Sequence, residues 1–537
     1  MNGLTPNADV WARIAESCAT DPRSGHHNLY EEVLGRHLGT DPHALALRIS
    51  SPDGATMSWS RLELDEAVSA VAERLVTVGG ALRGTVVAAL LDRSAGPFVL
   101  ALACWRIGAV YVPLYSGFGT RAIVDRIAQA RVELLVADPG HLQLAAEAAA
   151  ASPTPVIVGC YDIGPPASES GAADYRDLRG GFDLAVPPVV MTRTDELAAI
   201  LLTSGSTGTP KACRMAHTGW LATVPFARDA LGVRPGDVVL STADPGWSFG
   251  LITTGMSVLA LGGALHILAE RFDANEVIRI IGEGQVSQIV GAPAAFRKII
   301  DVLAARHVER LPGHLRLACS GGAALGSHTV ARWWEVAGSP LIDGYGLTEI
   351  GMVLASGSRD SELQPLPGFE VRLIGDGLHG SAGRLAVGPI PYPLSGSSGE
   401  PLPDEVPTGW FLTEDTFVRG TSGPLHYAGR TDDTIVSNGF NISALEVENA
   451  LRGIPGIRDV AVVGRADPEV TGQLVCAVVE ASSPGPTLAA EIQSRVRAEV
   501  GRHAYPRIIE FVDELPLGLT GKVDRQAVRE RMKAGSA

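Results

Sequence analysis

Short apolar runs and amphipathic stretches alternate along the first part of the chain. Residues 85–91 and 110–114 are continuous apolar runs with the length of a buried strand, and residues 96–107 between them are typical of a helix. Further apolar runs at 134–138 and 155–158 continue the alternation. This pattern predicts an α/β fold in which parallel-type sheets are covered by helices.

The pattern changes near Arg430, after which the strands are short and alternate with helices. A chain of 537 residues exceeds what one hydrophobic core normally holds, so at least two domains are expected. We expect a large domain over residues 1–430 and a small α+β domain over residues 437–537, joined by residues 431–436.

Composition and charge exclude several classes of protein. The net charge of −15 argues against a nucleic-acid partner, and no apolar run reaches the roughly 18 residues of a membrane span. The first 25 residues have no apolar core of the kind found in signal peptides. The six cysteines are scattered, without metal-ligand spacing, which favours free thiols in a reducing cytoplasm. We therefore expect a cytoplasmic enzyme.

The first chemical motif is TSGSTGTPK, residues 203–211, directly after an apolar run at 197–202. Its glycines allow close approach of the main chain to a ligand, and Lys211 adds a positive charge, as a polyphosphate requires. The motif differs from the GxxxxGK[ST] loop because Pro210 replaces the second glycine and Ala212 the hydroxyl residue. The alternative interpretation is a surface turn.

The second motif is DGYGLTEIG, residues 343–351. An aromatic residue among glycines can stack on a flat base, and a Thr–Glu pair offers the hard oxygen ligands that Mg²⁺ prefers. Taken alone, the segment is equally typical of an ordinary strand-to-loop turn.

Together these motifs resemble those of adenylate-forming enzymes, which include acyl-CoA synthetases, adenylation domains that load carrier proteins, and luciferases. The resemblance covers nearly the whole chain and is nearest to medium-chain and aromatic acyl-CoA synthetases. It assigns phosphate binding to Thr203, Ser204, Gly205, Ser206, Thr207, Gly208 and Lys211. It assigns the adenine and metal segment to Gly322, Ala323, Ala324, Asp343, Gly344, Tyr345, Gly346, Thr348 and Glu349, with Thr348 and Glu349 toward Mg²⁺.

The remaining assignments concern the ribose and the small domain. Asp415 in GWFLTEDTF and Arg430 in YAGRTDD stand where the family contacts the ribose. The plain alternatives are a solvated turn residue for Asp415 and a surface ion pair of Arg430 with Asp432. Asp432 stands at the family's interdomain hinge, which implies a mobile C-terminal domain. Lys522 in LTGKVDR then stands where the family has a catalytic lysine, acting with Lys211 and Glu349, and Gly439 where pantetheine passes.

Two glycines bear on the acid. Family members specific for acetate have a tryptophan where Gly346 stands, so we expect space for an acid larger than propionate. Relatives that activate amino acids have an aspartate where Gly250 stands, so an ammonium group would lack its partner, which favours an apolar acid. The expected acid pocket comprises Trp247, Phe249, Gly250, Gly291, Ser320, Gly321 and Gly346, with plain core packing as the alternative for Trp247.

The resemblance implies an AMP-forming acid–thiol ligase that uses ATP, Mg²⁺ and a small carboxylic acid. Coenzyme A is the favoured acceptor because Arg507 of AYPR lies near Arg502 and His503 in a region with a positive balance, although Asn441 replaces an arginine common in the family. A carrier protein as acceptor is the alternative. A third interpretation is a nucleotide-binding module without catalysis, which the joint presence of Lys211, Glu349, Asp415, Arg430 and Lys522 disfavours.

Overall fold

The fold is taken from a computed structural model of the full chain. It describes residues 7–51, 54–161, 176–177, 187–203, 210–269, 272–308, 310–313, 315–357, 362–375, 382–392, 406–420, 423–430, 434–437, 440–466, 473–502, 504–518 and 522–534. Within these ranges no helix combines the length and the apolar character needed to cross a membrane.

The first sheet has seven strands in the order β7-β6-β5-β3-β4-β8-β9. From β7 through β8 the neighbouring strands are parallel, and only β9 runs antiparallel to β8. The strands are β3 (Val86–Leu90), β4 (Val110–Leu114), β5 (Leu134–Ala137), β6 (Ile157–Cys160), β7 (Arg176–Asp177), β8 (Leu197–Thr203) and β9 (Lys211–Ala216). The helices connected with this sheet are α3 (Arg61–Thr77), α4 (Gly96–Arg106), α5 (Thr120–Ala130) and α6 (Leu142–Ala150).

Helix α4 is apolar on all sides, and every residue from Gly96 to Trp105 is buried. It contacts β3 and β4 on one side and the π-helix η6 (Phe249–Met256) on another, so its apolar surface has no solvent-facing stripe. The two sheets of the large domain therefore share one core around α4.

The second sheet has thirteen strands in the order β17-β18-β19-β20-β16-β15-β14-β13-β12-β10-β11-β1-β2. Its central part is parallel: β1 (Leu45–Ser50), β10 (Val238–Ser241), β11 (Ala264–Leu268), β12 (Gln288–Gly291), β13 (Leu317–Gly321) and β14 (Leu341–Leu347). An antiparallel edge strand, β2 (Thr56–Ser60), ends the sheet on one side. The other side is antiparallel: β15 (Gly351–Ser356), β16 (Leu363–Pro365), β17 (Glu370–Ile374), β18 (Ala382–Gly388), β19 (Phe411–Arg419) and β20 (Leu425–Arg430).

Helices and short helical turns cover this sheet. They are α1 (Asn7–Glu16), α2 (Arg36–Leu38), α7 (Ser257–Ala260), α8 (Ala274–Gly282), α9 (Pro293–Ala305), α10 (Ser327–Ala337), η2 (Glu31–Gly35), η4 (Gly219–Thr223) and η5 (Phe226–Ala230). The expected α/β class with parallel-type sheets is confirmed, but the antiparallel half goes beyond it. The apolar pattern of single strands does not distinguish this antiparallel pairing from a parallel one.

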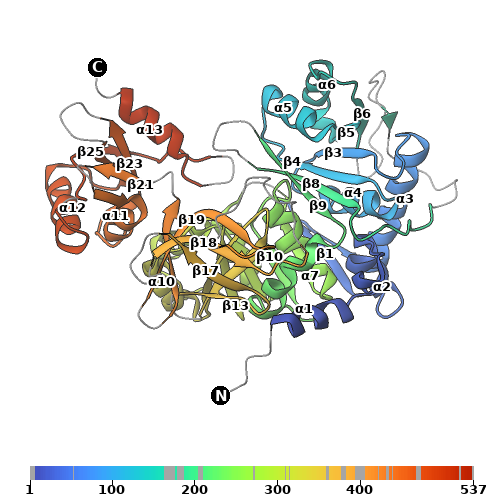
Figure 1. The fold of residues 1–537 in the computed structure, drawn as a ribbon, viewed down its shortest axis with the longest axis horizontal. Coiled ribbons are helices and arrows are strands. Elements are labelled where there is room, and N and C mark those ends of the chain that lie inside the picture. Colours follow the sequence, from blue (N-terminus) through green and yellow to red (C-terminus); the bar gives the residue numbers. More distant parts are fainter. Residues whose placement is uncertain are drawn as a thin grey trace.

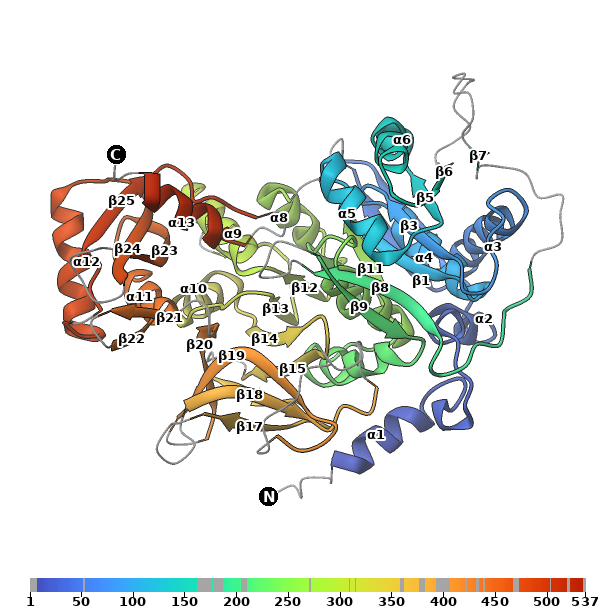
Figure 2. The same ribbon diagram turned by 45° about the horizontal axis from the view of Figure 1, so that its top comes forward.

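The small C-terminal domain lies beside α9 and α10 at one end of the molecule (Figures 1 and 2). It contains β21 (Thr434–Ser437), β22 (Phe440–Ser443), α11 (Ala444–Leu451), β23 (Ile457–Ala466), β24 (Gln473–Ala481), α12 (Pro486–Glu499), β25 (Ile508–Val512) and α13 (Arg525–Ala534). It has its own apolar core, as an independent domain requires. Arg297 of α9 pairs with Asp459 of β23 at 2.9 Å, which links the two domains in this arrangement.

Candidate active site

Adjacent strands of the second sheet bring three of the sequence segments side by side. In the parallel register Gly291 of β12 lies beside Ser320 of β13, and Gly321 lies beside Gly344 of β14. Because the carboxyl ends of parallel strands share one edge of a sheet, the expected pocket residues on these strands converge at this edge, where ligands of α/β proteins commonly bind. The edge is the candidate active site.

The phosphate motif lies in a hairpin of the first sheet. Strand β8 ends at Thr203 and β9 begins at Lys211, and these two residues are paired across the hairpin. Lys211 is exposed, as a lysine that meets phosphates must be. Ser204, Gly205, Ser206, Thr207 and Gly208 lie outside the described residues, so their phosphate role stays a prediction.

Lys522 of the C-terminal domain lies against the loop that follows β13. Gly322 has a φ of +87°, and a Cβ atom at this position would lie 3.3 Å from Lys522 Cε and 3.6 Å from Nζ. The lysine sits on a turn held by a 2.6 Å bond from the Gly518 amide to the Lys522 carbonyl. The segment before α13 extends toward the large domain (Figure 2). Residues some two hundred positions apart thus meet at the predicted adenine wall.

The adenine wall itself is mostly accessible. Gly322 and Ala323 are exposed and Ala324 is half-buried. The wall is held by Asp343, whose carboxylate accepts a 3.3 Å hydrogen bond from the Leu325 amide. Burial raises the pKa of Asp343 to about 7, and the amide bonds from Leu325 and Gly344 only partly oppose this. Asp343 therefore positions the loop.

Asp415 and Tyr345 are joined directly. The Tyr345 hydroxyl donates a 2.6 Å hydrogen bond to Asp415 Oδ2, and the Tyr427 hydroxyl lies 3.4 Å from Oδ1. Burial, and then the charge of Asp415, raise the pKa of Tyr345 well above its usual value, so the phenol stays a donor. The Tyr345 ring packs edge-on against Phe417, with 4.8 Å between ring centroids. Each carboxylate oxygen has two lone pairs, so Asp415 can still accept ribose hydroxyls.

The backbone of Arg430 lies directly opposite Asp415 in the β19–β20 pair. This register is compatible with the prediction that Asp415 and Arg430 contact the same ribose. The Arg430 side chain itself lies outside the described atoms. Asp432 and Gly439 also lie outside the described residues. Their roles as hinge and pantetheine contact stay predictions.

Thr348 and Glu349 follow β14 and are half-buried. The Thr348 carbonyl accepts a 3.5 Å hydrogen bond from the Cys213 thiol of β9, which ties this turn to the hairpin of the phosphate motif. Glu349 belongs to neither group of three potential metal ligands found among the described residues. One carboxylate still suits Mg²⁺, because this ion keeps water ligands and binds substrate phosphates.

An apolar wall closes the other side of the strand ends. A Cβ atom at Gly321 would lie 2.9 Å from Phe249 Cζ and 3.4 Å from Met352 Cε. A Cβ atom at Gly344 would lie 2.6 Å from Met352 Cε and 2.9 Å from Phe226 Cε2. Phe249 was expected here. Phe226 and Met352 were missed, and only the apolar run of residues 351–355 could have indicated Met352.

Ser320 also belongs to this edge. It is fully buried, and its hydroxyl has no hydrogen-bond partner within the described part of the protein. A buried hydroxyl without a partner costs free energy, which a bound polar group would recover.

The interpretation of Gly346 as open space is wrong. A Cβ atom at this position would lie only 2.2 Å from the Gly351 carbonyl oxygen and 2.6 Å from Met352 Cα. The glycine is required because β14 and β15 approach closely at a bulge between Tyr345 and Gly346. The missing side chain therefore leaves no pocket volume at this point.

Gly250 and Gly291 are also sites of close approach. A Cβ atom at Gly250 would lie 2.2 Å from the Asp244 carbonyl oxygen, and one at Gly291 would lie 2.2 Å from Thr242 Oγ1. An aspartate at position 250 would not fit this backbone. Asp244, the nearby carboxylate, accepts the Gly246 amide at 2.8 Å through its Oδ1 and forms a turn.

Trp247 is not among the nearest neighbours of Gly321. Its ring packs against Tyr115 and Phe118, with centroid distances of 6.0 and 5.8 Å, in the loop after β4. These are the contacts of the packing alternative, and they join the two sheets of the large domain. The sequence predicts both Trp247 and Phe249 in the acid pocket. In the structure Phe249 contacts the strand end at Gly321, and Trp247 has the packing contacts.

Comparisons with known proteins identify the family of the chain. The family model described as AMP-binding enzyme matches residues 36–408, and that of the AMP-binding enzyme C-terminal domain matches residues 446–522. The chain is 26% identical to acyl-coenzyme A synthetase ACSM2, mitochondrial, of Rattus norvegicus, over 89% of this chain and 86% of that protein. It is 28% identical to the propionate–CoA ligase of Escherichia coli K12, over 94% and 88%.

A solved structure shares the whole architecture. ATP-bound MatB from Rhodopseudomonas palustris superposes with a TM-score of 0.79 at 25% identity, over 95% of this chain and 99% of that one. The family models span both domains, and the site residues on β13, β14, β19 and the turn at Lys522 fall within or between the matched segments. The chain belongs to the AMP-binding enzyme family, the adenylate-forming enzymes that its motifs resemble.

Proposed function

We propose that the protein is an AMP-forming acid–CoA ligase. The observation that carries the proposal is the approach of Lys522 to Gly322, beside the Tyr345–Asp415 pair. An ammonium group on a separate domain, placed at a nucleotide site, suits a reaction in which negative charge develops on phosphate. The named activities of ACSM2 and of propionate–CoA ligase support the same chemistry.

In the proposed first step the acid carboxylate attacks the α-phosphorus of ATP, forming acyl-AMP and releasing pyrophosphate. Asp415 accepts the ribose hydroxyls, and Tyr345 stays protonated and holds the orientation of Asp415. Lys211 meets the phosphates, and Lys522 neutralises the oxygens on which charge increases. Mg²⁺, held through Glu349 and Thr348, supplies charge neutralisation at the phosphates when bound.

In the proposed second step the thiol of coenzyme A displaces AMP from the acyl group. Lys522 has no task in this step, which permits the C-terminal domain to rotate about the expected hinge at Asp432. ATP binding in the related MatB supports the nucleotide, whereas Mg²⁺ and coenzyme A follow from the family chemistry.

The acid is proposed to be apolar. Phe249, Met352 and Phe226 supply an apolar surface at the strand ends, and no aspartate can stand at position 250. We also propose that the acid is larger than propionate. The resemblance to medium-chain and aromatic acyl-CoA synthetases supports this size, whereas Gly346 does not. A panel of acids from acetate to octanoate and benzoate, measured by pyrophosphate release, tests both points. A preference for acetate, or for an amino acid over its des-amino analogue, would contradict them.

Loading of a carrier protein is the second candidate, favoured by Asn441 in place of an arginine. The Michaelis constants for coenzyme A and for pantetheine, which lacks the nucleotide, separate the two. Coenzyme A as acceptor predicts a clearly lower constant for the full molecule. Equal constants, with a carrier protein far better than either, would replace the first candidate.

We also propose a cytoplasmic location, which the six free cysteines support. Fractionation of the producing cells, with an immunoblot of each fraction, tests it. Recovery outside the cytoplasmic fraction would contradict it.

A further inference from the structure

A cavity of about 480 Å³ is lined by residues of α1, α2 and α7. These helices lie in the lower part of Figure 1. Its walls are of mixed character. Apolar surface comes from Ile14, Trp220 and Leu261, and polar groups come from Arg61, His37 and Cys18. The volume falls within the range of sites for small molecules.

Arg61 gives this cavity a buried positive charge. The residue is only 7% exposed, yet its guanidinium bonds to main-chain carbonyls, those of Gly262 at 2.9 Å and Asp41 at 3.3 Å. Among the described residues no carboxylate forms an ion pair with it. Burial lowers the pKa of Arg61, and the exposed Asp41 side chain only partly offsets this. A buried charge with incomplete compensation is costly, and an anion would relieve that cost.

The other basic groups of the cavity do not add free charge. Arg36 pairs with the buried Glu32 at 3.0 Å. Burial and the charge of Arg61 lower the pKa of His37 to about 4, so His37 is neutral near pH 7. Its Nε2 then donates to the Ala260 carbonyl at 3.1 Å. The cavity therefore presents one unmatched cation beside apolar walls.

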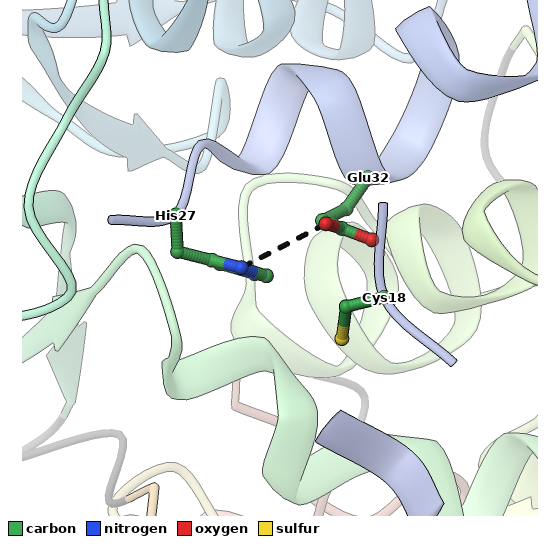
Figure 3. Close-up of side chains that lie close together, drawn as sticks. All are labelled: Cys18, His27 and Glu32. Atoms are coloured by element: carbon green, nitrogen blue, oxygen red, sulfur yellow. Dashed lines mark ion pairs between the residues drawn. The ribbon is translucent and has the colours of Figure 1, made fainter. Parts of the chain in front are cut away.

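Cys18, His27 and Glu32 lie together next to the cavity, and the His27 ring faces the Glu32 carboxylate (Figure 3). They form a wall and not a metal site. The Trp220 indole donates to His27 Nε2 at 3.1 Å, which leaves the ring proton on Nδ1, facing Thr20 O at 3.2 Å. Glu32 is occupied by the Ala19 and Thr20 amides and by Arg36.

The cavity is connected to the candidate acid pocket by one continuous helical segment. His37 contacts the carbonyl of Ala260, the last residue of this segment, and Arg61 bonds to the carbonyl of Gly262, two residues further on. The segment comprises η6 and α7, and its first residue, Phe249, reaches Gly321 in the apolar wall of the pocket. A ligand that draws Arg61 away from Gly262 would loosen the far end of the segment that carries Phe249.

We propose that this cavity is a second binding site, for a small amphipathic organic anion. The anionic head pairs with Arg61, and the apolar body lies against Trp220 and Leu261. The site is separate from the nucleotide site and does not depend on the reaction proposed above. Occupancy changes the Michaelis constant for the acid through η6 and α7.

The probe for the test is 1-naphthalenesulfonate, an aromatic anion without a carboxylate to be activated. Cys18 lines the cavity and is the one cysteine that is not fully buried. Saturating probe should slow its alkylation by N-ethylmaleimide at least fivefold, as read by peptide mass spectrometry. Because burial raises the pKa of Cys18 to about 12, the reaction is followed over hours at pH 8.5, and calorimetry measures the same binding directly.

Three variants make the test specific. Arg61→Met removes the charge, Ala44→Phe fills the cavity while keeping Arg61, and Arg332→Met removes an exposed arginine of α10 as the matched control. The first two should weaken probe binding at least tenfold and the control should not. Should Arg61→Met fail to fold, Ala44→Phe alone decides. Absence of probe binding in the wild type, or equal binding in the wild type and Ala44→Phe, would overturn the proposal.

Discussion

Replacing Lys522 with alanine should cripple acyl-AMP formation and leave thioester formation nearly intact. In the arrangement described, the side chain lies within van der Waals distance of the position that a Cβ at Gly322 would take, so its ammonium is at the nucleotide site. Loss of one donor that stabilises developing charge typically costs about 10²–10³ in rate, or roughly 2.7–4 kcal/mol. We expect a loss of this size in the first half-reaction.

The assay measures the two half-reactions separately. Pyrophosphate release with ATP and acid, without coenzyme A, reports the first. Thioester formation from synthetic acyl-AMP and coenzyme A reports the second and should change less than about threefold, because Lys522 serves only the step at phosphorus. Lys522 is exposed, so the melting temperature should stay nearly constant.

Lys533→Ala is the matched control, since Lys533 is an exposed lysine at the end of α13 in the same domain. It should affect neither half-reaction. Equal losses in both half-reactions for Lys522→Ala, at unchanged stability, would refute the reasoning that this lysine acts in only one arrangement of the domains.

Three further predictions concern the large domain. Phe249→Ala should shift preference toward longer or bulkier acids in the acid panel, because its ring contacts the strand end at Gly321; an unchanged preference would remove Phe249 from the pocket. Gly346→Ala should destabilise the protein by about 1–3 kcal/mol in thermal unfolding, because a Cβ atom there meets the β15 backbone. Gly140→Ala is the control and should be neutral, because the space around Gly140 is open. The pKa of Asp343 is about 7 in the folded protein and near 4 in the unfolded chain. Between pH 4 and 7 the unfolded chain therefore binds fewer protons, and the free energy of unfolding falls as the pH rises. The stability of wild type relative to Asp343→Asn should therefore fall by at most roughly 4 kcal/mol between pH 4 and 8 in denaturant titrations, and a pH-independent difference would contradict the raised pKa.

Motifs that lie along one strand or loop could be read from the sequence because their chemistry is local. Thr203 and Lys211 pair at the ends of the phosphate motif, and Cys213 of the same hairpin contacts the Thr348 carbonyl. Lys522 lies against Gly322 of the predicted adenine wall. For Asp415 and Arg430 the resemblance implied a common ligand, and the β19–β20 register places their backbones opposite each other. Their contact with a ribose stays a prediction.

The failures concern distances between backbones and between distant segments. From the sequence, the missing side chain of Gly346 predicts open space. The Gly351 backbone on β15 occupies that space and leaves no room for a Cβ atom. Trp247 and Phe249 are two residues apart in the sequence, and η6 begins at Phe249. The Trp247 ring contacts Tyr115, whereas the Phe249 ring contacts Gly321. Phe226 reaches the site through tertiary packing alone, for which the sequence has no local signal.

The most direct test of the central proposal uses an acid labelled with ¹⁸O in both carboxylate oxygens. Attack of the carboxylate on the α-phosphorus, followed by thiolysis at the carbonyl carbon, transfers one labelled oxygen to AMP. Mass spectrometry of the nucleotide after turnover with ATP and coenzyme A should therefore find AMP with a single ¹⁸O, together with unlabelled pyrophosphate. Label in inorganic phosphate with ADP as the product, or AMP without label, would contradict an acyl-AMP intermediate.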